Sequence, residues 1–176
     1  PQEYSLVVQD LIARGPCNFL VFGCGKDSLL WNELNAGGKT VFLEHAAGWI
    51  DQVRGKCPTC DIELVKYWTR LGVDDGRRDL VGSTDLLMQD VIDKTAALGL
   101  TKWDVILVDA PTAYERGTIG RMQSIATAAE LSDASSTVFV HDCNRAAEDW
   151  WSKAYFGEPA VEARAERKMR KFVGGP

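Results

Sequence analysis

The sequence predicts an α/β fold, a mainly parallel sheet covered by helices on both faces in three layers. Short apolar runs typical of buried strands alternate along the chain with segments of helical periodicity, which is the pattern of βαβ units. The 176 residues and 45% hydrophobic content suffice for one core, and no repeat or linker divides the chain. We therefore expect a single domain over residues 1–176.

The N-terminal half predicts three strands that alternate with helices. Residues 4–14 have helical periodicity and end at Gly15-Pro16, and residues 18–22 form an uninterrupted apolar run, as expected of a strand buried on both faces. The next helix runs to Asn35, with Asp27 or Ser28 as its cap. The other elements of this half are a strand at 40–43 ending at Glu44, a short helix at 49–54 and a strand at 62–68.

The C-terminal half continues this alternation after a polar, glycine-rich loop at 70–83. Thr84 or Asp85 can cap a helix that extends to Ala97. The elements that follow are a strand at 103–108, a loop at 110–118, a helix at 119–131, a strand at 137–140 and a helix at 144–156. Residues 161–173 alternate loosely and predict either a last strand or a short hairpin.

Polar residues follow four of the five predicted parallel strands. They are Gly23 and Gly25 after the first strand, Glu44 after the second, Asp109 after the fourth, and His141 and Asp142 after the fifth. Ligands on such a sheet bind beyond the carboxyl ends of the strands. We therefore expect these side chains to meet at one site.

The turn Gly23-Cys-Gly25 suits a ligand that carries a ribose. Glycines let the backbone approach a ligand, the helix after them offers free amides, and Glu44 can accept hydrogen bonds from ribose hydroxyls. This pattern fits both NAD and S-adenosylmethionine, with Gly23, Gly25, Asp27, Ser28, Glu44 and Asp109 as the candidate cofactor-binding residues. Ser28 replaces the third glycine of the dinucleotide fingerprint, which counts against a pyrophosphate. A tight turn without a ligand is the alternative.

Asp109, His141 and Asp142 are the candidate catalytic residues. A histidine between two carboxylates can accept or deliver a proton. The oxygens of Asp109 and Asp142, with those of Asn144, would also suit a hard divalent cation. Helix caps, salt bridges and a structural histidine are the alternatives. Neither a GxSxG nor a Walker sequence is present, which argues against serine hydrolysis and P-loop phosphoryl transfer.

Charge and aromatic residues suggest the kind of substrate. The net charge of −5 and the pI of about 5.1 argue against a nucleic-acid partner. The candidate substrate-binding residues are Tyr114, Arg116, Arg121 and Arg145, because arginine forks match carboxylates and a tyrosine face can stack on a sugar. A basic C-terminal cluster is either a solvated face or a rim that attracts an acidic substrate; its members are Arg164, Arg167, Lys168, Arg170 and Lys171.

Two further features bear on the protein's setting. Cys57 and Cys60 form a lone CxxC, which is compatible with a local disulfide, with free thiols or, less readily, with half a zinc site.

No apolar run approaches the roughly 18 residues of a membrane span. The first residues carry no leader, so we expect no membrane contact from this segment; an N-terminal anchor would have to lie outside it.

Four ordered segments resemble the plant glucuronoxylan 4-O-methyltransferase family, which includes the irregular-xylem proteins. The segments are NFLVFGCGKDSLLW (18–31), GKTVFLE (38–44), WDVILVDAPT (103–112) with GRM (120–122), and VFVHD (138–142) with Arg145. The resemblance covers about residues 4–156.

This resemblance implies a class I methyltransferase fold, which is Rossmann-like, and S-adenosylmethionine as the methyl donor. It implies O-methylation of a uronic acid, the glucuronic acid 4-hydroxyl of a cell-wall polysaccharide such as glucuronoxylan, in the Golgi lumen and with a divalent metal. By position, Gly23, Gly25 and Glu44 would hold the donor. Asp109, His141 and Asp142 would face the reacting hydroxyl.

Two other functions remain compatible with the sequence. A nucleotide-sugar or NAD-linked enzyme could use the same fold, and binding of NAD in place of S-adenosylmethionine would select it. A non-catalytic relative that assists polysaccharide assembly would show no turnover. The acids at the strand ends favour catalysis.

Overall fold

The computed structural model describes residues 2–112 and 114–175 and contains one seven-stranded sheet. The strand order is β3-β2-β1-β4-β5-β7-β6, in which β1 to β5 are parallel and β7 is antiparallel to both of its neighbours. The strands are β1 (Asn18–Phe22), β2 (Lys39–Glu44), β3 (Asp61–Leu64), β4 (Val105–Val108), β5 (Thr137–Val140), β6 (Val161–Arg164) and β7 (Lys168–Val173). The predicted α/β class with a mainly parallel sheet is confirmed.

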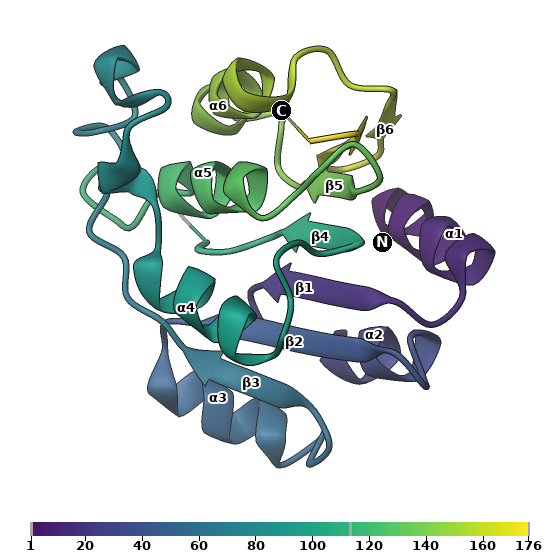
Figure 1. Cartoon of the computed structure of the whole chain (residues 1–176). Coiled ribbons are helices and arrows are strands. Elements are labelled where there is room, and N and C mark those ends of the chain that lie inside the picture. The colour runs from purple at the N-terminus through teal and green to yellow at the C-terminus, as the bar shows by residue number, and fades with distance from the viewer. Residues whose placement is uncertain (1, 113, 176) are drawn as a thin grey trace.

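Helices cover both faces of this sheet (Figure 1). They are α1 (Ser5–Arg14), α2 (Ser28–Leu34), α3 (Ala47–Arg54), α4 (Gln89–Ala97), α5 (Met122–Glu130) and α6 (Ala146–Phe156). Alternate residues of β1 point to opposite faces: Leu20 and Phe22 join a core with α4, α5 and α6, whereas Phe19 and Val21 join one with α1, α2 and α3. No helix in the described ranges is long and apolar enough to cross a membrane.

Two predicted elements differ from the structure because side chains of α5 bind the backbone. The predicted strand at 62–68 ends at Leu64, and the amides of Trp68 and Thr69 donate to Gln123 Oε1 instead, at 2.7 and 3.2 Å. The predicted helix at 84–97 is broken. Its first part is a 3₁₀ turn (Thr84–Leu86), and the Met88 amide then donates to Thr127 Oγ1 at 3.0 Å before α4 begins.

The C-terminal segment forms the hairpin that was one of its two predicted outcomes. Because β7 is antiparallel to β5, the residues that precede β7 lie at the carboxyl end of β5. Val140 pairs with Arg170, and the Cys143 amide donates to the Lys168 carbonyl at 2.9 Å. The turn between β6 and β7 is thereby placed at the edge of the sheet where ligands are expected.

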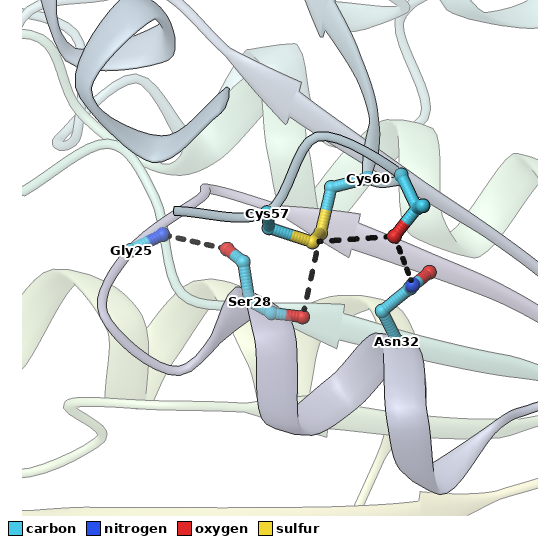
Figure 2. Close-up of a disulfide and its surroundings, with 6 residues drawn as sticks. Gly25, Ser28, Asn32, Cys57 and Cys60 are labelled. Atoms are coloured by element: carbon cyan, nitrogen blue, oxygen red, sulfur yellow. Dashed lines mark hydrogen bonds between the residues drawn. A yellow bond between two sulfur atoms is a disulfide. The ribbon is translucent and has the colours of Figure 1, made fainter. Parts of the chain in front are cut away.

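A disulfide joins Cys57 and Cys60, so the free-thiol and zinc alternatives are wrong for these residues in the structure. Figure 2 shows the bridge beside the first turns of α2. Cys60 Sγ lies 3.7 Å from the Ser28 carbonyl oxygen, and Asn32 Nδ2 donates to Thr59 Oγ1 at 3.2 Å. The bridged loop therefore packs against the helix that follows the glycine turn.

Replacing both cysteines, in Cys57→Ser/Cys60→Ser, should lower the thermal midpoint. Closure of so short a loop contributes about 2 kcal/mol, which corresponds to roughly 4–8 °C in a protein of this size. Calorimetry with and without a reductant measures the effect. Reductant should lower the midpoint of the unmodified protein to that of the double variant and leave the variant unchanged. Equal midpoints for the oxidised protein and the variant would contradict a stabilising bridge.

Candidate active site

A cavity of about 430 Å³ lies at the carboxyl ends of β1, β2 and β4. All six predicted cofactor-binding residues line it: Gly23, Gly25, Asp27, Ser28, Glu44 and Asp109. Its walls also include Tyr4, Cys24, Trp31, His45, Trp49, Thr112, Tyr114, Arg121 and Arg167. The strand ends thus converge on one cavity, as the parallel topology predicted.

The glycine turn after β1 leaves no room for side chains. Gly23 has a φ of +113°, and a Cβ there would lie 2.9 Å from the Cβ of Ala110. The Gly25 amide donates to Ser28 Oγ at 2.8 Å. The buried Ser28 side chain therefore stabilises the turn, and Gly23 allows the turn to pack closely against the end of β4.

Glu44 is held at the floor of the cavity by backbone amides. Its Oε1 accepts from the amides of His45 and Ala46 at 2.8 and 2.9 Å, whereas Oε2 accepts longer bonds from Cys24, 3.3 Å from its amide and 3.9 Å from its Sγ. Burial alone would raise the pKa of Glu44, but hydrogen bonds from His45 and Ala46 outweigh it and lower the pKa. Glu44 is therefore an ionised acceptor with one oxygen available to a ligand.

Asp109 is the predicted catalytic residue that reaches the cavity. The Tyr4 hydroxyl donates to Asp109 Oδ2 at 2.5 Å, and His141 Nδ1 lies 2.8 Å from Oδ1. Burial opposes ionisation of Asp109, but the hydrogen bond from His141 and the charge of Arg121 lower its pKa. Burial likewise would lower the pKa of His141, yet its hydrogen bond to Asp109 raises it. The pair therefore favours an ionised carboxylate beside a protonated imidazole.

His141 and Asp142 lie behind Asp109 and are not among the described residues that line the cavity. Only 3% of the His141 side chain and 1% of that of Asp142 are exposed, so the structure buries both side chains, and their role at the reacting hydroxyl stays a prediction. His141 Nε2 instead faces Glu3 Oε1 at 3.4 Å. Asp142 has a φ of +60°, a left-handed conformation that aspartate tolerates better than most residues.

Three arginines surround the Asp142 carboxylate. The shortest nitrogen–oxygen distances are 2.8 Å to Arg121, 3.0 Å to Arg145 and 3.3 Å to Arg167. Burying a carboxylate is costly unless cations and hydrogen bonds compensate it. Asp142 is therefore the anchor of a buried ionic cluster rather than a group presented to substrate.

Arg121, a predicted substrate-binding residue, lines the cavity, but its guanidinium is bonded to other groups of the protein. Its side chain is 3% exposed, and its guanidinium donates to the carbonyls of Pro111, His141 and Asp109 at 2.8, 2.9 and 2.7 Å. A fourth bond goes to Asp142 Oδ2. These contacts use its planar fork to join the ends of β4 and β5.

The remaining predicted substrate residues are placed differently from one another. Tyr114 lines the cavity and is exposed. Arg145 lies over the Tyr114 ring, 4.7 Å from its centroid, and donates to the Thr112 carbonyl at 2.8 Å. Arg116 is exposed and packs beside Gly72, away from the residues that line the cavity. Of this set, Tyr114 has the placement that the prediction required.

Tyr4 and Arg167 line the cavity but were not among the predicted site residues. Tyr4 belongs to the 3₁₀ turn Gln2–Tyr4 and meets Asp109 across 105 residues of sequence, a contact that no local pattern signals. Arg167 belongs to the basic C-terminal cluster, for which a rim facing an acidic substrate was one of two interpretations. The clustering of basic residues near the C-terminus was therefore the sequence feature that could have identified Arg167 as a site residue.

The donor atoms of Asp109, His141 and Asp142 fit a divalent cation in type and spacing. One atom from each, two carboxylate oxygens and an imidazole nitrogen, lie within 4.8 Å of one another. Mixed oxygen and nitrogen donors suit first-row divalent metals. Because three guanidinium groups already lie within 3.3 Å of the Asp142 carboxylate, a cation would depend mainly on Asp109 and His141.

Comparison with solved structures supports the fold. A TehB-like SAM-dependent methyltransferase from Corynebacterium glutamicum matches 98% of this chain and 93% of its own, with a TM-score of 0.57 and 9% identity. A putative SAM-dependent methyltransferase from Streptococcus mutans matches 96% of this chain and 48% of its own, with a TM-score of 0.58 and 10% identity. The class I, Rossmann-like methyltransferase fold implied by the resemblance is confirmed.

Comparison of sequences identifies the family. Glucuronoxylan 4-O-methyltransferase 2 of Arabidopsis thaliana is 42% identical over 168 residues, and Arabinogalactan O-methyltransferase 2 of the same plant is 34% identical over 177 residues. The alignments cover 87% and 89% of this chain but only 58% and 60% of these relatives. The model of the IRX15/IRX15L/GXM family matches residues 2–172, and the chain belongs to that family.

Proposed function

We propose that this protein is an S-adenosylmethionine-dependent O-methyltransferase. Its acceptor is a uronic acid of a cell-wall polysaccharide, the 4-hydroxyl of glucuronic acid in a chain such as glucuronoxylan. The observation that carries the proposal is that the glycine turn, Glu44 and Asp109 meet in one cavity. The names of the glucuronoxylan and arabinogalactan methyltransferases in the family support the reaction and the class of acceptor.

The cavity suits the donor in size and in chemistry. Its volume of about 430 Å³ falls within the range of small-molecule sites. Glu44 Oε2 would accept hydrogen bonds from the ribose hydroxyls, and the glycine turn would admit the amino-acid part of the donor. Trp49 supports this wall, because its Nε1 donates to the Cys24 carbonyl at 2.7 Å.

Methyl transfer here is an in-line displacement. The sugar oxygen forms a bond to the methyl carbon, the carbon–sulfur bond breaks, and its electron pair stays on sulfur. The proton on the attacking oxygen becomes strongly acidic as the new bond forms, so an ionised carboxylate is a sufficient base. Asp109 faces the cavity and would take that proton, while Tyr4 and His141 hold its two oxygens in place.

A divalent cation is the second part of the proposal. Asp109 and His141 in its neutral form would hold it, with Asp142 as a third donor, so binding of the ion would displace the imidazole proton. When bound, such an ion would lower the pKa of the sugar hydroxyl and orient it. The aspartates and the imidazole would then act as fixed ligands, positioned by Arg121 and Tyr4.

We place this chemistry in the Golgi lumen. The Cys57–Cys60 disulfide supports that assignment, because structural disulfides persist in oxidising compartments. The acidic polysaccharide would be the partner in that compartment.

Glu44→Gln should weaken donor binding without unfolding the loop after β2. A glutamine can keep its oxygen at the Oε1 position, where the His45 and Ala46 amides need an acceptor, and place an NH₂ at Oε2. The loss of a charge-assisted bond corresponds to roughly 10–150-fold in Kd. Calorimetric titration with S-adenosylmethionine measures it, and an unchanged Kd would remove Glu44 from the donor site.

Asp109→Asn should lower kcat by about 10²–10⁴-fold, because loss of a general base typically has that effect. The assay measures transfer from methyl-labelled donor to glucuronic-acid-bearing oligosaccharides. A matched titration with donor separates turnover from donor affinity. Chelation should also abolish transfer, and added divalent ions should restore it. Full turnover by the Asn variant would rule out both the base and the metal role of Asp109.

A further inference from the structure

The turn between β6 and β7 brings Arg167 to the donor cavity. Residues before β7 lie at the carboxyl end of β5, where Asp142 follows the strand. Arg167 lines the cavity together with Tyr114 and Asp109, and 42% of its side chain is exposed. A cation from the C-terminal hairpin therefore borders the space that an acceptor must enter to reach Asp109.

Two other arginines contact the buried carboxylates beneath Arg167. Arg121 and Arg145 contact Asp142 at 2.8 and 3.0 Å, and they lie 3.9 and 3.8 Å from Glu148. Asp142 and Glu148 thus share these two guanidinium groups, while Asp109, 3.5 Å from Arg121, has His141 as its nearer partner at 2.8 Å. Burial moreover raises the pKa of Glu148, which favours its neutral form, and a neutral carboxyl group needs no cation as a partner.

Arg167 is the arginine that a ligand can most readily engage. Its 3.3 Å distance to Asp142 is the longest of the three, and its exposed fraction of 42% compares with 20% for Arg145 and 3% for Arg121. Hydrogen bonding to Tyr114 and the charge of Asp142 raise its pKa, so it stays charged. A ligand carboxylate in the cavity could pair with the Arg167 guanidinium, because Asp142 would still contact Arg121 and Arg145.

We propose that Arg167 binds the carboxylate of the uronic acid acceptor and sets the preference for acidic over neutral sugars. This inference rests on the proposed function, because it assigns a residue to the acceptor of that reaction. Tyr114, which contacts both Arg167 and Arg145, would contribute an aromatic face to the sugar ring. An arginine fork suits a carboxylate because it can donate two parallel hydrogen bonds.

The experiment measures binding before turnover. The protein, saturated with S-adenosylhomocysteine, is titrated with a glucuronic-acid-bearing xylo-oligosaccharide and with its carboxyl-reduced counterpart. The unmodified protein should bind the acid roughly tenfold or more tightly than the reduced sugar, and Arg167→Gln should remove that preference. Arg167→Lys should restore it in part, because lysine keeps the charge but lacks the fork.

Arg164→Gln is the matched control on the same hairpin. Arg164 is 79% exposed and bonds to Glu162, which keeps Arg170 as a partner at 2.9 Å when Arg164 is replaced. This variant should retain the acid preference of the unmodified protein. Melting curves for both glutamine variants confirm that the hairpin is intact.

Turnover on the same two sugars then separates this inference from the proposed reaction. A preference that depends on Arg167, with methyl transfer to the acid, supports both. The same binding preference without methyl transfer upholds the role of Arg167 and contradicts the proposed reaction. An acid preference that survives in Arg167→Gln, or that is absent from the unmodified protein, overturns the role of Arg167.

Discussion

The buried contact between Arg121 and Asp142 is the interaction on which the rest of the site depends. Arg121 stands at the start of α5 and binds the carbonyls that follow β4 and β5. Asp142 supplies the negative charge that makes a buried guanidinium tolerable. With these strand ends joined, Asp109 is held toward the cavity, and His141 is held behind it. The ion pair thus belongs to a set of buried residues that position Asp109 at the surface of the cavity.

The parallel sheet and its ligand edge were predictable because they follow from patterns that act over a few residues. Continuous apolar runs predicted 18–22 and 137–140 with the boundaries observed for β1 and β5. Once the strands are parallel, their carboxyl ends must share an edge. The convergence of Gly23, Glu44 and Asp109 on one cavity therefore needed no knowledge of side-chain packing.

Which of the predicted site residues are buried and which are exposed was not predictable from such local patterns. Arg121 and Arg116 look equally suited to a rim in the sequence, yet one is buried by four hydrogen bonds and the other is exposed. What decides between them is pairing with groups distant in the chain. The Tyr4 contact to Asp109 and the broken helix before α4 have the same origin, since distant side chains override local propensity.

The proposed reaction uses two walls of the cavity, with the ribose of a donor at Glu44 and an acceptor between Asp109 and Arg167. The most direct test is a crystal structure with S-adenosylhomocysteine and a glucuronic-acid-bearing oligosaccharide bound together. We expect ribose hydroxyls within hydrogen-bonding distance of Glu44 and a sugar hydroxyl beside Asp109, facing the sulfur. A donor product bound outside this cavity, or a sugar hydroxyl remote from Asp109, would contradict the proposed reaction.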